Sequence, residues 1–157
     1  MKLALYRSVA GDKLDTIIDL FSGRYGYSHV ELIFDNVDGS WFSSSPRDGA
    51  CRFKNIVPKE KHWVIVDLPE IDYIQEVNIY SLAKCLVGDK YDYYGILFWY
   101  VFFWVKKQKD KNWWCSEVVA YLLGHVDYRV TPNELAKYYH APKSEFKITF
   151  SKTFNKE

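Results

Sequence analysis

Short apolar runs separated by turn-forming residues occupy the first half of the chain, and this pattern predicts β-strands. The predicted strands are Leu3–Val9, Ser28–Asp35, Ser40–Ser45, Cys51–Val57 and His62–Leu68. Asn36–Gly39 has the residues of a turn, so the strands on either side of it are expected to form a hairpin. One helix interrupts the strands, because Asp12 can cap it and apolar residues at helical spacing continue to Phe21.

Helical spacing replaces this pattern in the second half of the chain. The predicted helices are Ile71–Val87, Tyr91–Val105, Trp113–Leu123 and a short one that Thr131 and Pro132 open and that runs to about Tyr139. A polar loop is expected at Lys106–Asn112 and a last strand at Ser144–Phe150. The order of elements predicts an α+β domain in which an antiparallel sheet packs against helices.

Length and charge narrow the classes of protein to which the chain can belong. A chain of 157 residues is the size of one domain, which we take to be 1–157, and 48% hydrophobic residues supply a core. A net charge of +1 leaves no electrostatic footprint for nucleic acid, and no glycine-rich phosphate loop is present. We therefore predict no nucleic-acid partner and no nucleotide cofactor.

The three cysteines, Cys51, Cys85 and Cys115, are odd in number and lack metal-ligand spacing. They imply neither a disulfide framework nor a metal site, so we expect no cofactor at all. The first residues lack the apolar core and cleavage site of a signal peptide. These observations together favour a cytoplasmic protein.

Aromatic residues make up 18% of the chain, which indicates either a core built from rings or an apolar groove for an acyl chain. Gly95–Val105 contains ten apolar residues after its glycine, too few for a membrane-spanning helix of about 20. Four lysines follow it, up to Lys111. Residues 95–111 are therefore either a weak membrane-surface contact or a core helix followed by a solvated loop.

Cys115 lies where a polar loop leads into an apolar helix, so it falls in or just before the first helical turn. Unpaired N–H groups there stabilise a thiolate and can also hold an oxyanion. The alternative is a buried structural cysteine. Cys51, in a strand, and Cys85, near a helix C-terminus, are interpreted as structural.

A thiolate nucleophile needs an imidazole partner, and His29 is the best placed of the four histidines. It lies in a predicted strand in which His29 and Glu31 share one face, so the carboxylate can orient the ring. His62, His125 and His140 lie at element ends, where a structural role is expected. The residues thus predict a Cys–His site made by Cys115 and His29.

Three segments in this order carry a family resemblance: Ser28-His29-Val30-Glu31, Lys90-Tyr91-Asp92 and Trp114-Cys115-Ser116-Glu117-Val118-Val119. They resemble the circularly permuted branch of the NlpC-type papain-like cysteine hydrolases, with the YiiX/YebB-like permuted amidases nearest in pattern. Lecithin retinol acyltransferase-like proteins belong to the same branch. The strand Gly49–Phe53 and the Thr131-Pro132 segment are also similar to the family, so the resemblance spans about Tyr27 to Leu135.

The resemblance implies a papain-like fold with Cys115 as catalytic nucleophile and His29 as catalytic base. The family often has its third polar residue on the strand after the histidine strand, but Ser40–Ser45 offers no carboxylate or histidine. A serine hydroxyl, Glu31 or no third residue at all are the alternatives, and we favour Glu31. Glu117 and Asp92 are further candidates, but we expect them to be structural, with Glu117 stabilising the first turn of its helix. The remaining candidates for the oxyanion site or the cleft are Ser116, Ser44 and Tyr27, and the loop Ser43–Gly49 is expected to border the cleft.

The function expected from the residues and the resemblance is a cysteine hydrolase, an amidase, peptidase or esterase that works through an acyl-enzyme. Its substrate would be a peptide, an amide or an acyl ester. One alternative is a lipid-acting acyltransferase at a membrane surface, using residues 95–111. A second is a catalytically inactive papain-like binding module. A small protein of this kind would suit a bacterium or a phage.

Overall fold

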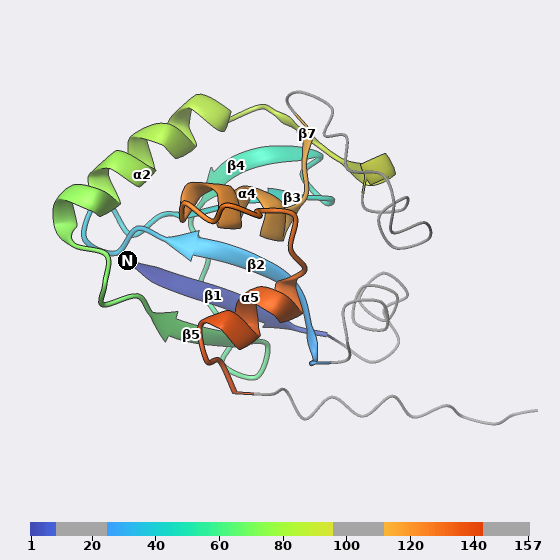
Figure 1. Ribbon diagram of the computed structural model, residues 1–157, viewed down its shortest axis with the longest axis horizontal. Coiled ribbons are helices and arrows are strands. Elements are labelled where there is room, and N and C mark those ends of the chain that lie inside the picture. Colours follow the sequence, from blue (N-terminus) through green and yellow to red (C-terminus); the bar gives the residue numbers. More distant parts are fainter. Residues whose placement is uncertain (9–24, 96–111, 143–157) are drawn as a thin grey trace, which may run out of the picture.

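The computed structural model describes residues 1–8, 25–95 and 112–142, and Figure 1 shows their arrangement. The helix predicted to end at Phe21, the strand Ser144–Phe150 and most of the aromatic segment 95–111 lie outside the described residues. Within the described ranges, strands and helices form a mixed α+β fold.

Seven strands of the described chain form one sheet in the order β5-β1-β2-β3-β4-β6-β7. They are β1 (Lys2–Arg7), β2 (Tyr27–Ile33), β3 (Trp41–Ser45), β4 (Ala50–Lys54), β5 (Trp63–Asp67), β6 (Lys90–Tyr91) and β7 (Asn112–Trp113). The first five match predicted strands to within a few residues. All neighbouring pairs are antiparallel except β6 and β7, which are parallel.

The helices are α2 (Tyr73–Leu86), α4 (Cys115–Leu122) and α5 (Pro132–Tyr138). Asp72 caps α2 and Thr131 caps α5, each with a side-chain oxygen that accepts the N–H three residues on. The helix predicted from Tyr91 is wrong at its start, because Tyr91 belongs to β6 and helical residues begin at 93. The helix predicted from Trp113 is also wrong there, since Trp113 belongs to β7 and α4 starts at Cys115.

The sheet presents two different faces. One face carries Leu3, Leu5, Val30, Leu32 and Phe42, which pack into the main core with α4 and α5. In Figure 1, α4 lies in front of β2 and β3, and α5 lies in front of β1 beside the start of β2. The opposite face carries Ala4, Ile33 and Trp41, with Trp63 packed against them. Because side chains alternate along a strand, His29 and Glu31 share this second face with Ile33.

The ladder between β2 and β3 is short, and this opens the sheet near His29. The two strands pair at Leu32–Phe42 and Ile33–Trp41. Farther along, the Ser43 hydroxyl donates to the Val30 carbonyl, and the Ser44 hydroxyl donates to the Trp113 carbonyl. The start of α4 therefore lies beside the point where β2 and β3 separate.

The beginning of β2 is held by the C-terminal part of the described chain. The pairing of β1 with β2 shifts between Tyr6 and Arg7, so Ser28 is an extra residue in β2 just before His29. The backbone N–H of Tyr27 donates to Asn133 Oδ1 at 2.9 Å, and the Tyr27 hydroxyl donates to the Pro142 carbonyl. A bulge of this kind re-aims the neighbouring side chain, which here is His29.

Candidate active site

Cys115 is the first residue of α4, so its thiol lies at the helix terminus where backbone N–H groups have no partner within the helix. The residue is only 2% exposed and packs in the main core. The positive end of the helix dipole lies at this position. The prediction that Cys115 lies at the start of a helix is confirmed.

His29 brings its imidazole to this thiol from the histidine strand. The ring lies close enough to Cys115 for the thiol to act on the pKa of His29, and its Nε2 lies 3.0 Å from Glu31 Oε1. Since Glu31 occupies Nε2, Nδ1 is the nitrogen left for the thiol. The separation of β2 from β3 explains how a cysteine on the helix-covered side of the sheet meets a histidine on the other face.

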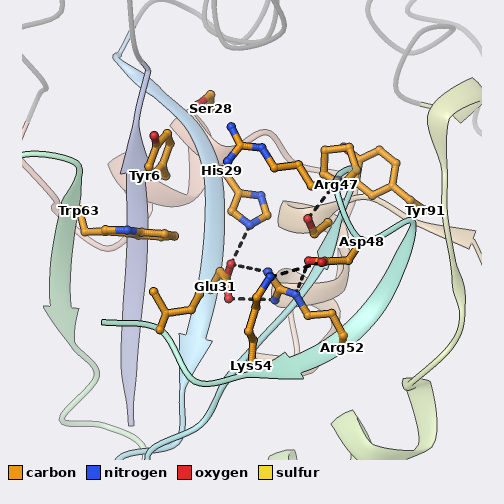
Figure 2. A pocket seen from close by; sticks show the side chains of 13 residues that line it. Tyr6, Ser28, His29, Glu31, Arg47, Asp48, Arg52, Lys54, Trp63 and Tyr91 are labelled. Atoms are coloured by element: carbon orange, nitrogen blue, oxygen red, sulfur yellow. Dashed lines mark hydrogen bonds and ion pairs between the residues drawn. The ribbon is translucent and has the colours of Figure 1, made fainter. Parts of the chain in front are cut away.

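Glu31 is almost fully buried, and two cations satisfy its carboxylate. Beside the contact with His29, it accepts a bidentate pair of hydrogen bonds from Arg52, at 2.9 and 2.8 Å. Arg52 Nε in turn donates to Asp48 Oδ2 at 2.8 Å. Figure 2 shows this continuous chain of contacts from Asp48 through Arg52 and Glu31 to His29.

The electrostatics of the pair follow from these contacts. Burial opposes protonation of His29, but the charge and hydrogen bond of Cys115 and the carboxylate of Glu31 outweigh it and raise the pKa of His29 to about 10. Burial also disfavours the Glu31 carboxylate, yet His29 and Arg52 hold its pKa below the usual value. The site therefore favours an imidazolium next to a carboxylate at neutral pH.

Arg52 and Asp48 were not among the residues that sequence reasoning selected. Arg52 pairs with Ser43 across β3 and β4, and continuing the register of Leu32 with Phe42 places Glu31 opposite Ser43 on the other side. Ser43 is small, so Arg52 can reach over it to Glu31. The hairpin register was the signal that would have found this pair.

The three further candidates for the oxyanion site or the cleft have other hydrogen-bond partners. The Ser116 hydroxyl donates to the Val130 carbonyl, the Ser44 hydroxyl to the Trp113 carbonyl and the Tyr27 hydroxyl to the Pro142 carbonyl. All three residues are buried. The backbone N–H groups of the first turn of α4 are thus the better-placed donors for an oxyanion.

The remaining cysteines and histidines have separate environments. Burial raises the pKa of the Cys51 thiol to about 12, whereas Cys85 is exposed on α2 rather than packed in the core. His62 stacks on Tyr6 with ring centroids 5.8 Å apart, and His125 hydrogen-bonds Tyr139. His140 follows α5 with a φ of 55°.

Glu117, two residues after the cysteine, is fully buried and bonded to Arg129 at 3.2 Å. Its carboxylate also accepts the backbone N–H of Trp114 and so caps α4. Burial raises the pKa of Glu117 to about 7, against the opposing effect of Arg129. These contacts agree with the expected role in stabilising the first turn.

A cavity of about 350 Å³ opens beside His29, and we call it the His29 cavity. Its apolar walls are formed by Tyr6, Ile56 and Trp63. The loop between β3 and β4 contributes Arg47 and Asp48 to the lining. The expectation that the Ser43–Gly49 loop borders a cleft is confirmed at residues 45–48. Glu31 and Arg52 also line the cavity.

No helix within the described residues is long and apolar enough to cross a membrane. In the same part of the chain, no cluster of three His, Cys, Asp or Glu side chains could hold a metal ion. The expected membrane-surface contact falls on residues 95–111, which, apart from Gly95, lie outside the description.

Comparisons of the chain with protein-family models, with curated proteins and with solved structures found no match. The family resemblance carried by the His29 and Cys115 segments stays a prediction.

Proposed function

We propose that this chain is a cysteine hydrolase with a papain-like arrangement of its α+β domain, which cleaves an amide or ester bond through an acyl-enzyme. One observation carries the proposal: Cys115 begins a helix and meets an imidazole whose other nitrogen is held by a buried carboxylate. A nucleophile, a base and a residue that orients the base are the parts that covalent acyl transfer requires.

In the first step, the Cys115 thiolate attacks the substrate carbonyl carbon, and the carbonyl π electrons move to oxygen. N–H groups of the first turn of α4 stabilise this oxyanion. The His29 imidazolium then gives its proton to the leaving amine or alkoxide as the carbon–nitrogen or carbon–oxygen bond breaks. The product of this step is a thioester on Cys115.

In the second step, neutral His29 takes a proton from water, and the resulting hydroxide attacks the thioester. Collapse of the oxyanion expels the thiolate, and the imidazolium–thiolate pair is restored. Glu31 fixes the orientation of the ring through Nε2 and stabilises its protonated form throughout. Arg52 acts through Glu31 as a positioning residue.

We prefer hydrolysis to lipid acyl transfer because the Cys115–His29 site lies within the described chain, whereas the transfer hypothesis depends on residues 95–111, which lie outside it apart from Gly95. The cysteines of the described chain are free, which supports a reducing, cytoplasmic setting as part of the proposal. A binding module without turnover remains the outcome of a failed test.

The test is the rate at which iodoacetamide alkylates each cysteine at pH 6.5, followed by mass spectrometry. Cys115 should react faster than the exposed Cys85, and Cys51 should hardly react because its pKa is about 12. His29→Ala should abolish the advantage of Cys115, while the control His125→Ala should keep it.

Slow alkylation of Cys115 that His29→Ala leaves unchanged would overturn the hydrolase proposal. Fast alkylation would be followed by a screen of amide and ester substrates, in which Cys115→Ala should be inactive.

A further inference from the structure

The His29 cavity has an apolar end and a charged end. Its apolar walls come from Tyr6, Ile56 and Trp63, all of which are partly exposed. In Figure 2, Tyr6 and Trp63 lie on one side of the imidazole, whereas Asp48 and Arg52 lie on the other. A ligand in the cavity therefore has rings on one side of the imidazole and charged groups on the other.

The charged side chains in the described lining already hold one another. Glu31 accepts two hydrogen bonds from Arg52 and lies 3.0 Å from the imidazole. Asp48 is held by Arg52 at 2.8 Å and by Lys54 at 3.3 Å. Arg47 also interacts within the protein. A charged ligand would have to break one of these contacts, whereas an uncharged group leaves them intact.

Trp63 is the centre of a cluster of rings that pack edge to face. Its ring centroid lies 5.1 Å from that of Tyr6, 5.0 Å from that of Trp41 and 6.4 Å from that of His29, at interplanar angles of 70°, 77° and 68°. Aromatic pairs favour this geometry, so a further ring gains more here than its buried area alone provides. The cavity volume of about 350 Å³ is near the lower end of the usual range for ligands, roughly 300–1,000 Å³. These features favour one aromatic side chain over a long acyl chain.

The position of the cavity relative to the reacting groups indicates which part of the substrate it holds. His29 lines the cavity, and Cys115 is not among the described residues that do. In the proposed reaction the acyl carbon bonds to Cys115 Sγ, while the His29 imidazolium gives its proton to the leaving nitrogen as the carbon–nitrogen bond breaks. The group on the imidazole side is therefore the leaving amine.

We propose that the His29 cavity is the leaving-group site of the enzyme and takes an uncharged aromatic side chain. The substrate is then a peptide in which an aromatic residue supplies the nitrogen of the scissile bond. The inference rests on the proposed hydrolase function and adds to it a substrate class and two specificity-determining residues, Ile56 and Trp63.

The first experiment measures binding of uncharged amino-acid amides to the full chain carrying Cys115→Ala, by NMR titration of the Trp63 indole signal. N-acetyl-L-phenylalaninamide should bind about tenfold or more tighter than N-acetyl-L-alaninamide, because its ring is buried in the cavity. The corresponding glutamate and lysine compounds should bind no tighter than the alanine compound.

Ile56→Ala should weaken binding of the phenylalanine compound by about threefold to fivefold and leave the alanine compound unaffected, because it removes part of the apolar wall. Val57→Ala is the matched control. Val57 is the next residue along the chain, but it is 92% exposed and is not part of the described lining, so this variant should change neither affinity.

The second experiment compares two isomeric peptides with the wild-type protein, by mass spectrometry of the products. Acetyl-alanyl-phenylalaninamide places the ring on the leaving side of the central amide, and acetyl-phenylalanyl-alaninamide places it on the acyl side. The first peptide should be cleaved at its central amide with a kcat/KM about tenfold or more higher than the second.

Equal binding of the phenylalanine and alanine compounds would overturn the inference, as would tighter binding of a charged compound or of octanamide. Equal cleavage of the two peptides, or faster cleavage of the second, would overturn the assignment to the leaving group. No cleavage of either peptide by a protein whose Cys115 alkylates rapidly would overturn the inference and leave the hydrolase proposal standing. Slow alkylation of Cys115 would overturn the hydrolase and, with it, the assignment of the aromatic group as part of a substrate.

Discussion

Replacing Arg52 by methionine tests the chain of contacts behind His29 most directly. The variant keeps an apolar stem of similar length but removes both hydrogen bonds to the buried Glu31 carboxylate, at 2.9 and 2.8 Å. At about 1.5 kcal/mol for each hydrogen bond to a charged group, the expected loss in the free energy of unfolding is about 3 kcal/mol. That figure agrees with the lower end of the ~3–5 kcal/mol cost of breaking a buried ion pair.

Lys54→Met is the matched control. Lys54 lies two residues away on β4, lines the same cavity and contacts the same Asp48, but its side chain is 52% exposed. An exposed ion pair is screened by solvent, so this variant should lose less than about 1 kcal/mol. Urea unfolding followed by tryptophan fluorescence at pH 7 gives both values.

The loss should also depend on pH. Arg52 helps to lower the pKa of Glu31, so the stability from this pair is present above the unfolded value of 4.5 and is lost as pH falls through the folded value. The difference between wild type and Arg52→Met should therefore shrink when unfolding is repeated at pH 3.5. Equal losses for Arg52→Met and Lys54→Met at pH 7, or a difference that does not change with pH, would refute the reasoning.

Three further predictions concern the groups around the thiol. The His29 ring should stay protonated up to pH 9 and titrate near 10 in an NMR pH titration, and titration near 6.5 would contradict this. The stability that its protonated form contributes is fully present below pH 6.5, the unfolded value, and should be lost as pH rises from there through the folded pKa of about 10. The pKa of Glu117 is about 7, so raising pH from 4.5 to 8 ionises this buried carboxyl and destabilises the wild type. The free energy of unfolding of Glu117→Gln should therefore rise by about 3 kcal/mol relative to that of the wild type over this pH range. A difference between the two proteins in thermal unfolding that does not change with pH would contradict this. Asn133→Ala leaves the Tyr27 N–H without its acceptor, so it should cost about 1–3 kcal/mol and slow alkylation of Cys115; an unchanged alkylation rate would show that this brace does not position His29.

Strong local patterns made the larger elements predictable. The five longer strands follow apolar runs between turn residues, and α5 follows the capping signal of Thr131 and Pro132. The two-residue strands β6 and β7 are too short to show any periodicity. Their aromatic residues Tyr91 and Trp113 adjoin helical segments, so the pattern assigned them to those helices.

The same limit applies to the site. Strand alternation alone places His29 and Glu31 on one face, and the loop-to-helix boundary alone places Cys115 at a helix start. The contact of Arg52 with Glu31 depends on the register of three strands, and the contact of Cys115 with His29 depends on where β2 and β3 part. Neither relationship can be read from neighbouring residues, because both are set by tertiary pairing.

The hydrogen bond from the Tyr27 N–H to Asn133 joins residues that are 106 positions apart, and this separation affects folding during synthesis. A chain growing on the ribosome presents β2 long before the segment that fixes its first residue. The histidine, the cysteine helix and their brace are complete only when the chain has emerged to about Pro142. Long-range contacts of this kind form late in folding, so we expect His29 to activate the Cys115 thiol only after the chain has emerged and folded, and not while it is still exposed to other newly made proteins.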